Sequence, residues 1–103
     1  MSKAFPVNAA LQIIPLKTTE PYPFVDEAIA IIQKKGLSYE VGPFSTSIEG
    51  DWATIAALVE EIREALFANG LDEFLVHLQV QFDRQKPVLA SEKTAKFQRQ
   101  NRD

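Results

Sequence analysis

Hydrophobic residues in this sequence switch between the two-residue spacing of strands and the three-to-four-residue spacing of helices in a definite order. Residues 7–14 are apolar and extended in character, and residues 25–32 carry an apolar stripe of helical period. Alternation returns over 37–49, a second helical stripe covers 55–66, and residues 74–82 alternate strictly again. This order is that of the split βαβ unit. We therefore predict an α+β, ferredoxin-like βαββαβ fold, a four-stranded antiparallel sheet with both helices on one face.

Proline, glycine and capping residues predict where these elements end. Proline cannot donate to a sheet ladder, so a proline after an apolar run predicts the end of a strand. Glycine after a helical stripe predicts the end of the helix, and an aspartate before a stripe predicts its cap. The predicted boundaries are a strand stop at Pro15, a helix start at Pro23, a helix stop at Gly36, strands over 37–41 and 44–49 joined by a tight bend at Gly42-Pro43, a helix cap at Asp51, a helix stop at Asn69-Gly70 and a last strand over 74–84.

Length and composition exclude several classes of protein. The chain has 103 residues, no cysteine and one histidine, His77. That length suits one domain, which buries about 65% of its unfolded surface and has little room for an elaborate active site. Disulfides and thiolate metal sites are excluded, and one histidine argues against a zinc site within one subunit. Apolar runs stay short of a membrane span and the N-terminus lacks a signal-peptide pattern, so we expect a cytoplasmic protein with no membrane partner.

Charge divides the chain into two parts. Residues 1–83 hold five basic and twelve acidic residues, whereas residues 84–103 hold six basic and two acidic residues. We predict a ferredoxin-like domain over 1–86 and a basic C-terminal tail over 87–103, with a short helix at about 91–98. Polar residues dilute the basic charge and the acidic body repels phosphate, so we predict a solvated or subunit-contacting tail and no nucleic-acid partner. The central strands also lack the aromatic platform of RNA-binding sheets.

Alternation also separates the two faces of the predicted sheet. We expect the helices to cover one face, and the open face to carry short hydroxyl, amide and carboxylate side chains with almost no Lys or Arg. Its predicted members are Asn8, Ala10, Gln12, Ile14, Ser38, Glu40, Ser45, Ser47, Glu49, Leu75, His77, Gln79, Gln81 and Asp83. Amides and hydroxyls suit fixed hydrogen bonds to a ligand or to another sheet. The open face therefore predicts either a ligand site or an assembly surface.

Three segments carry a family resemblance. Residues 42–52, GPFSTSIEGDW, are similar to a signature of glycine-proline-x-x-threonine-x-x-glutamate-glycine, which belongs to the small thiamine-binding protein family. The segments LQIIPLKT, 11–18, and VQFDRQK, 80–86, are similar to the first and last strands of that family. The family is related to two-domain proteins that bind thiamine and hydroxymethylpyrimidine. The resemblance spans about residues 7–87 and implies a ferredoxin-like subunit, dimers of dimers formed through sheets, and binding of a thiamine-type pyrimidine without catalysis.

Two residues depart from the family pattern. Lys17 and Ser45 stand where family members commonly have glycine. At the second of these positions, a serine side chain would narrow any pocket that relies on bare backbone.

The chemistry of thiamine selects the candidate site residues. Thiamine has a cationic thiazolium and an aminopyrimidine, so its site needs a carboxylate, hydroxyls or amides, and an apolar wall. We expect the carboxylates to pair with a ring nitrogen or the cation, and the hydroxyls and amide to bond the pyrimidine. The predicted ligand-binding residues are Thr46, Ser47, Glu49, Gln79 and Asp83. The aromatic candidates for stacking are Tyr22, Phe44 and Trp52. No catalytic residue, metal or cofactor is predicted; thiamine is the expected ligand.

Most of these candidates, and His77, also have a purely structural interpretation. Glu49 precedes a helix cap and favours the helix N-terminus electrostatically, and Thr46 falls on the core face of its strand. For Asp83 and Arg84 the alternative is an intersubunit or local ion pair. For the remaining candidates, the alternatives are an interface amide for Gln79, a sheet-surface residue for His77, a packing lid for Trp52 and a loop anchor for Tyr22.

The sequence thus leaves two main functional hypotheses and one minor one. The first is non-catalytic binding of thiamine or a related pyrimidine at the open sheet face of a homo-oligomer, a dimer or tetramer. The alternative is a structural or regulatory assembly module with no small-molecule ligand. An enzyme is the minor hypothesis, because the sequence offers no nucleophile-base pair, metal cluster or phosphate-binding glycine loop, and His77 is its one candidate general base.

Overall fold

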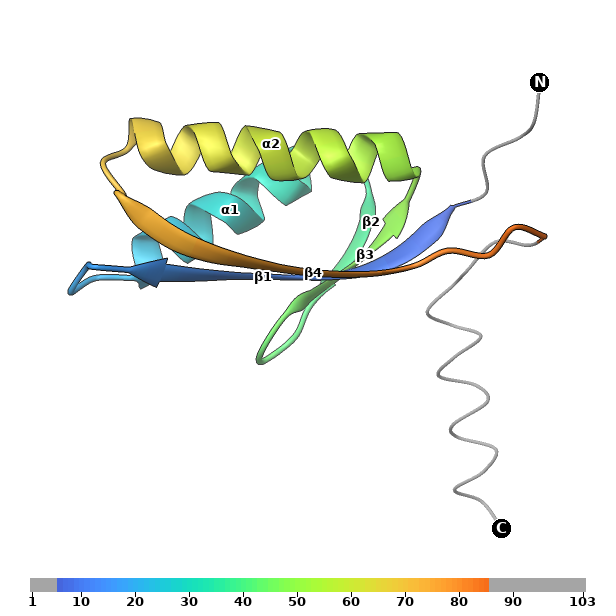
Figure 1. Ribbon diagram of the computed structural model, residues 1–103, viewed down its shortest axis with the longest axis horizontal. Coiled ribbons are helices and arrows are strands. Elements are labelled where there is room, and N and C mark those ends of the chain that lie inside the picture. The colour runs from blue at the N-terminus through green and yellow to red at the C-terminus, as the bar shows by residue number, and fades with distance from the viewer. Residues whose placement is uncertain (1–5, 86–103) are drawn as a thin grey trace, which may run out of the picture.

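Six helices and strands follow one another in the predicted order in the computed structural model, which describes residues 6–85 (Figure 1). They are β1 (Val7–Leu16), α1 (Tyr22–Lys34), β2 (Ser38–Val41), β3 (Thr46–Gly50), α2 (Trp52–Ala68) and β4 (Glu73–Gln81). The strands form one antiparallel sheet in the order β2-β3-β1-β4, and both helices lie on the same face of it. The predicted ferredoxin-like fold is confirmed. The predicted tail and its helix at about 91–98 lie outside the described residues.

Strand register fixes which side chains share a face of the sheet. In β1, Asn8 lies between Glu49 of β3 and Gln81 of β4, and two residues later Ala10 lies between Ser47 and Gln79. These rows point away from the helices, because side chains alternate across a strand. The residues between them on β1, which point toward the helices, are buried: Val7, Ala9 and Leu11. The predicted division between two faces is confirmed for the residues that pair in β1, β3 and β4. Ser45 and Asp83, which were predicted on the open face, lie outside the strands, because β3 begins at Thr46 and β4 ends at Gln81.

The hydrophobic core lies between this sheet and the two helices. Helix α2 contributes four residues at helical spacing, each fully buried: Ile55, Leu58, Ile62 and Leu66. Helix α1 contributes Ala28 and Ile32, and β3 contributes Ile48. The stripe that predicted α2 is therefore the surface that this helix buries. Of the stripe that predicted α1, Ala28 and Ile32 are buried, whereas Val25 and Ile29 are only partly buried.

The ends of α2 follow their predicted signals. The Asp51 carboxylate accepts a hydrogen bond from the Thr54 backbone N–H at 3.3 Å, which satisfies one of the free donors of the first turn. Asn69 caps the other end, and Gly70 follows with a φ of 94° that glycine adopts without strain. Helix α1 begins at Tyr22, one residue before the predicted Pro23.

The prediction that Pro15 stops the first strand is wrong. Strand β1 continues to Leu16, and Pro15 lies opposite Phe74 of β4. The register explains this, because β3 pairs with β1 only as far as Leu11. Beyond that point β1 is an edge strand on the β3 side, where a missing N–H costs no ladder hydrogen bond.

The last strand is shorter than predicted. Strand β4 ends at Gln81, whose partner Asn8 lies near the start of β1, and not at Arg84. The Asp83 carboxylate accepts a hydrogen bond from the Gln85 backbone N–H at 2.8 Å, a local turn that competes with extended pairing.

Lys17 occupies a backbone conformation that suits glycine. Its φ is 54°, in the left-handed region, and its ammonium lies 2.9 Å from the Glu73 carboxylate in an exposed ion pair. This conformation costs a residue with a Cβ about 1–2 kcal/mol, whereas an exposed ion pair contributes less than about 1 kcal/mol. Glycine would adopt this conformation at residue 17 without that cost.

We expect Lys17→Gly to raise the free energy of unfolding by about 0.5–1 kcal/mol, because relief of the left-handed strain outweighs the lost ion pair and the added freedom of the unfolded chain. Chemical denaturation measures this change. Lys17→Ala is the control, since it removes the same ion pair with Glu73 but keeps a Cβ, and it should give no gain. A greater stabilisation by alanine than by glycine would contradict this explanation.

Candidate functional site

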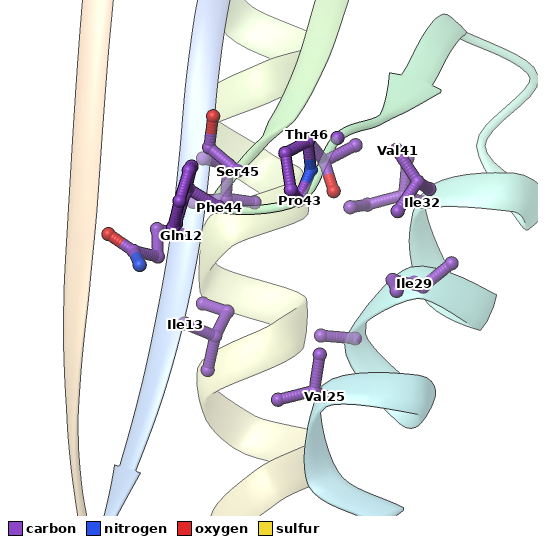
Figure 2. A pocket seen from close by; sticks show the side chains of 13 residues that line it. Gln12, Ile13, Val25, Ile29, Ile32, Val41, Pro43, Phe44, Ser45 and Thr46 are labelled. Carbon is purple, nitrogen blue, oxygen red and sulfur yellow. The ribbon is translucent and has the colours of Figure 1, made fainter. Parts of the chain in front are cut away.

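A pocket of about 220 Å³ lies on the helix side of the sheet (Figure 2). It is bounded by α1, by the middle of β1 and by the loop of residues 42–45 that joins β2 to β3, which we call the hairpin loop. The residues that line it are Leu11, Gln12, Ile13, Val25, Ala28, Ile29, Ile32, Val41, Gly42, Pro43, Phe44, Ser45 and Thr46. We call this cavity the helix-side pocket.

The walls of the helix-side pocket are mostly apolar. Figure 2 shows Val25 and Ile29 of α1 on one side of the cavity and Ile13 of β1 on the other, with Pro43 and Thr46 across one end. Helix α1 forms a wall because the stripe that faces the sheet continues past the buried core residues. The hairpin loop leaves a gap beside it, since β3 stops pairing with β1 at Leu11. The cavity thus lies where the sheet stops backing the helix.

Three lining residues have polar side chains, Gln12, Ser45 and Thr46, and none of the described residues that line the pocket is charged. Thr46 is 7% exposed, the one polar residue among the buried residues of the described chain. A cavity of this kind favours a flat, neutral ring with a few hydrogen-bonding groups. A full charge would lose its hydration there without a partner of opposite charge.

The hairpin loop is shaped by a close approach of backbone to backbone. The Gly42 N–H donates to the Ser45 carbonyl at 2.9 Å, and a Cβ on Gly42 would lie 2.9 Å from that same oxygen. A side chain at residue 42 would therefore push the loop open. The prediction that the third strand starts at Phe44 is wrong for this reason: the loop closes over four residues, and β3 starts at Thr46.

The open face of the sheet holds three of the five predicted ligand-binding residues. Ser47 lies between Ala10 and Glu40, and Gln79 lies on the other side of Ala10. Glu49 lies one row further, beside Asn8. The structure brings these three side chains to one face, while Thr46 lies on the opposite face in the helix-side pocket.

Two depressions lie on the open face, and both involve Gln79. One, the open-face depression, is lined by Ala10, Gln12, Phe44, Ser45, Val76, His77, Leu78 and Gln79. The other is lined by Asn8, Ala10, Gln79, Val80, Gln81 and Phe82. Ser47 and Glu49 line neither of them, and Asp83 lies beyond the end of β4 with its carboxylate bonded to the Gln85 backbone. The five predicted residues therefore do not gather around one cavity within a subunit.

The three aromatic candidates differ in their surroundings. The Trp52 ring meets the Phe82 ring edge to face, with centroids 5.3 Å apart, which agrees with its interpretation as a packing residue. Tyr22 is 78% exposed and lines neither the helix-side pocket nor the two open-face depressions. Phe44 is 81% exposed at the tip of the hairpin loop, and it lines both the helix-side pocket and the open-face depression.

The wall residues of the helix-side pocket were not among the predicted site residues. Val25 and Ile29 belong to the apolar stripe of α1, which predicts burial in a core. The signal that could have found the pocket is the glycine-proline step, because a loop that bends at Gly42-Pro43 cannot fill the space beside the helix. Within residues 6–85, no cluster of acidic and histidine side chains could hold a metal ion, and no helix is long and apolar enough to cross a membrane.

Comparison with known proteins connects this geometry to a family. The family described as thiamine-binding protein matches residues 9–98 of the chain. The chain belongs to the thiamine-binding protein family. A UPF0045 protein of Clostridium perfringens is 28% identical over 91 residues, which cover 87% of this chain and 95% of that protein.

Solved structures share the family fold over nearly the whole chain. The structure of a domain of unknown function from Bacillus cereus, DUF77, matches with a TM-score of 0.83 at 28% sequence identity. The match covers 93% of this chain and 95% of the Bacillus cereus chain. A candidate thiamine biosynthesis/salvage protein of Thermotoga maritima matches with a TM-score of 0.80 at 26% sequence identity, over 89% of this chain and 98% of the Thermotoga maritima chain. In this thiamine-binding family member, the first five residues of the glycine-proline signature, 42–46, all line the helix-side pocket.

Proposed function

We propose that this protein binds thiamine or a related aminopyrimidine, such as hydroxymethylpyrimidine, in the helix-side pocket and performs no chemistry on it. One observation carries the proposal: the segment that bears the family signature, Gly42 to Thr46, forms one wall of a small apolar pocket. The family description and the Thermotoga maritima relative supply the class of ligand.

The chemistry of the walls favours one end of thiamine over the other. The aminopyrimidine is flat and neutral at neutral pH, and its ring nitrogens and amine suit the Thr46 and Ser45 hydroxyls and the hairpin-loop backbone. Because the walls carry no charge, the cationic thiazolium gains nothing by entering. The cavity is also smaller than the 300–1,000 Å³ that is usual for whole drug-sized ligands. The proposal therefore puts the pyrimidine inside and the thiazolium at the mouth.

The open face has a separate role in this proposal. The sequence placed the ligand there, on Ser47, Glu49 and Gln79, and that placement stays a prediction. We favour the helix-side pocket because the whole segment from Gly42 to Thr46 lines it and because α1 gives it an apolar wall, which neither open-face depression has. We assign the open face to the contact between copies of the chain in a homo-oligomer, either a dimer or a tetramer. We expect this oligomer in the cytoplasm.

Thermal unfolding with added ligand tests the proposal. A ligand present at 100 times its dissociation constant adds about 2.7 kcal/mol of stability, which raises the midpoint of a domain of this size by about 10 °C or more. We expect millimolar hydroxymethylpyrimidine and thiamine both to raise the midpoint. The thiazole alcohol that forms the other half of thiamine should give little change. A shift with the thiazole alone, or with neither pyrimidine compound, would contradict the proposal.

An assembly module without a ligand is the second candidate function. It is favoured by the open face, where the neighbouring pairs Asn8–Gln81 and Ala10–Gln79 of β1 and β4 offer amide and methyl groups in place of the usual charged pairs. The thermal measurement separates the two candidates, because an assembly module gains no stability from either pyrimidine.

A further inference from the structure

We propose that the hairpin loop couples the helix-side pocket to self-association: a second copy seated on the open face contacts Phe44, so that ligand binding and subunit pairing strengthen each other. This inference rests on the proposed function, and it goes further by assigning to the pocket a means of regulation.

The first observation is that the two cavities share a wall. Gln12, Phe44 and Ser45 line both the helix-side pocket and the open-face depression, so the tip of the hairpin loop forms part of the wall of each cavity. The loop itself is closed by one backbone hydrogen bond, from Gly42 to Ser45. A contact that moves or fixes this loop from the open face therefore changes the pocket on the other side.

The second observation is the position of Phe44. Figure 1 shows that the tip of the β2–β3 hairpin extends beyond the plane of β1 and β4, on the side away from the two helices. Phe44 lies at this tip and is 81% exposed, more than any other large hydrophobic residue of the described chain. A phenyl ring on a projecting loop is well placed to reach a molecule seated on the open face, and its burial there would contribute to association.

The composition of the open face favours a second copy as that molecule. Residues 1–83 carry a net charge of −7, so two such bodies repel each other over most of their surface. Between Asn8 and Ile14 of β1 and between Leu75 and Gln81 of β4, however, the open face has no acidic residue, lysine or arginine. Amides both donate and accept hydrogen bonds, so a face built from them complements itself across a two-fold axis.

Thermodynamic linkage then gives the coupling a measurable form. If the paired state holds Phe44 against the pocket, ligand binds the paired state more tightly than the single subunit. By reciprocity, ligand strengthens pairing by the same factor, which for typical coupled sites is about 10-fold. Affinity for ligand should accordingly rise with protein concentration across the range where subunits associate.

Analytical ultracentrifugation of the full chain from nanomolar to micromolar concentration, with and without millimolar thiamine, tests this coupling. We expect thiamine to lower the dissociation constant of self-association by about 10-fold. In Phe44→Ser we expect weaker self-association that thiamine no longer strengthens, and an affinity for thiamine that does not vary with protein concentration. Tyr22→Ser is the matched control, because Tyr22 is similarly exposed, at 78%, yet lines neither the pocket nor the open-face depressions; it should behave as the unsubstituted protein does.

The outcomes separate this inference from the function on which it rests. Thiamine binding that leaves self-association unchanged, or a chain that stays monomeric while it binds, would overturn the coupling and leave the proposed function standing. The coupling would also be overturned if Phe44→Ser lowered the affinity for thiamine by the same factor at every protein concentration, so that the affinity of the variant still rose as subunits associated. Phe44 would then be only a wall of the pocket. Absence of binding by either thiamine or hydroxymethylpyrimidine at any concentration would overturn the proposed function itself.

Discussion

Thr46→Val is expected to weaken binding of hydroxymethylpyrimidine and thiamine by about 10-fold without loss of stability. Valine has nearly the same shape as threonine and suits a strand, so β3 and the core beneath it should be retained. The substitution removes the hydroxyl of a residue that is buried in the helix-side pocket, and a ligand group left without its partner costs about 1–3 kcal/mol. Isothermal titration measures the affinity, and chemical denaturation measures the stability.

Ser47→Ala is the matched control for this substitution. Ser47 is the next residue along β3, but its side chain lies on the open face between Ala10 and Glu40. Its hydroxyl should therefore contribute little to binding if the ligand occupies the helix-side pocket. The reverse pattern, loss with Ser47→Ala and none with Thr46→Val, would place the ligand on the open face instead.

Ile48→Ala is expected to lower the free energy of unfolding by about 2–5 kcal/mol, a large part of the 5–15 kcal/mol typical of small domains. Ile48 is fully buried between the sheet and the helices, and it pairs with Ala9 on one side and Tyr39 on the other. Truncation removes apolar contacts and leaves a cavity, because the sheet and the two helices can move only partly into the space. The melting midpoint should fall by about 10 °C or more.

Val76→Ala is the control for this prediction. Val76 also faces the helices, but it lies on edge strand β4 and is 38% exposed, so truncation should cost about 1 kcal/mol or less. Equal losses from Val76→Ala and Ile48→Ala would contradict a core centred on Ile48 between β3 and the two helices.

The order of elements and the faces of the sheet were predictable because both depend on local periodicity. Helical stripes and strict alternation are properties of neighbouring residues, and burial of Ile55 and Leu58 on one helix face follows from their spacing. The caps at Asp51 and Gly70 were predictable for the same reason, since each acts within one turn of the helix.

Strand ends were less predictable because they depend on neighbours that are distant in sequence. Pro15 would stop the strand only if the sheet needed a backbone N–H donor at that position, and this depends on how far β3 reaches along β1. Likewise, the alternation of Phe44 with Ile48 resembles a strand. The close approach of Gly42 to the Ser45 carbonyl, however, places Phe44 in the hairpin loop and outside the sheet.

The pocket was the least predictable feature. The stripe of α1 indicates that Val25 and Ile29 are shielded from water, but it does not reveal whether a facing side chain fills the space beside them. That depends on the path of the hairpin loop, which three-dimensional packing sets. The signature residue Thr46 was recognised from the sequence, whereas its separation from Ser47 and Glu49 by the sheet was visible only once the strands had been placed.

A crystal structure of the protein grown with millimolar hydroxymethylpyrimidine tests the central proposal most directly. We expect density for the pyrimidine ring in the helix-side pocket, between Ile29 of α1 and Thr46 of β3, with its polar groups on the hairpin loop. Density against Gln79 and Ser47 on the open face, with the helix-side pocket empty, would contradict the proposal and return the ligand to the face that the sequence first suggested.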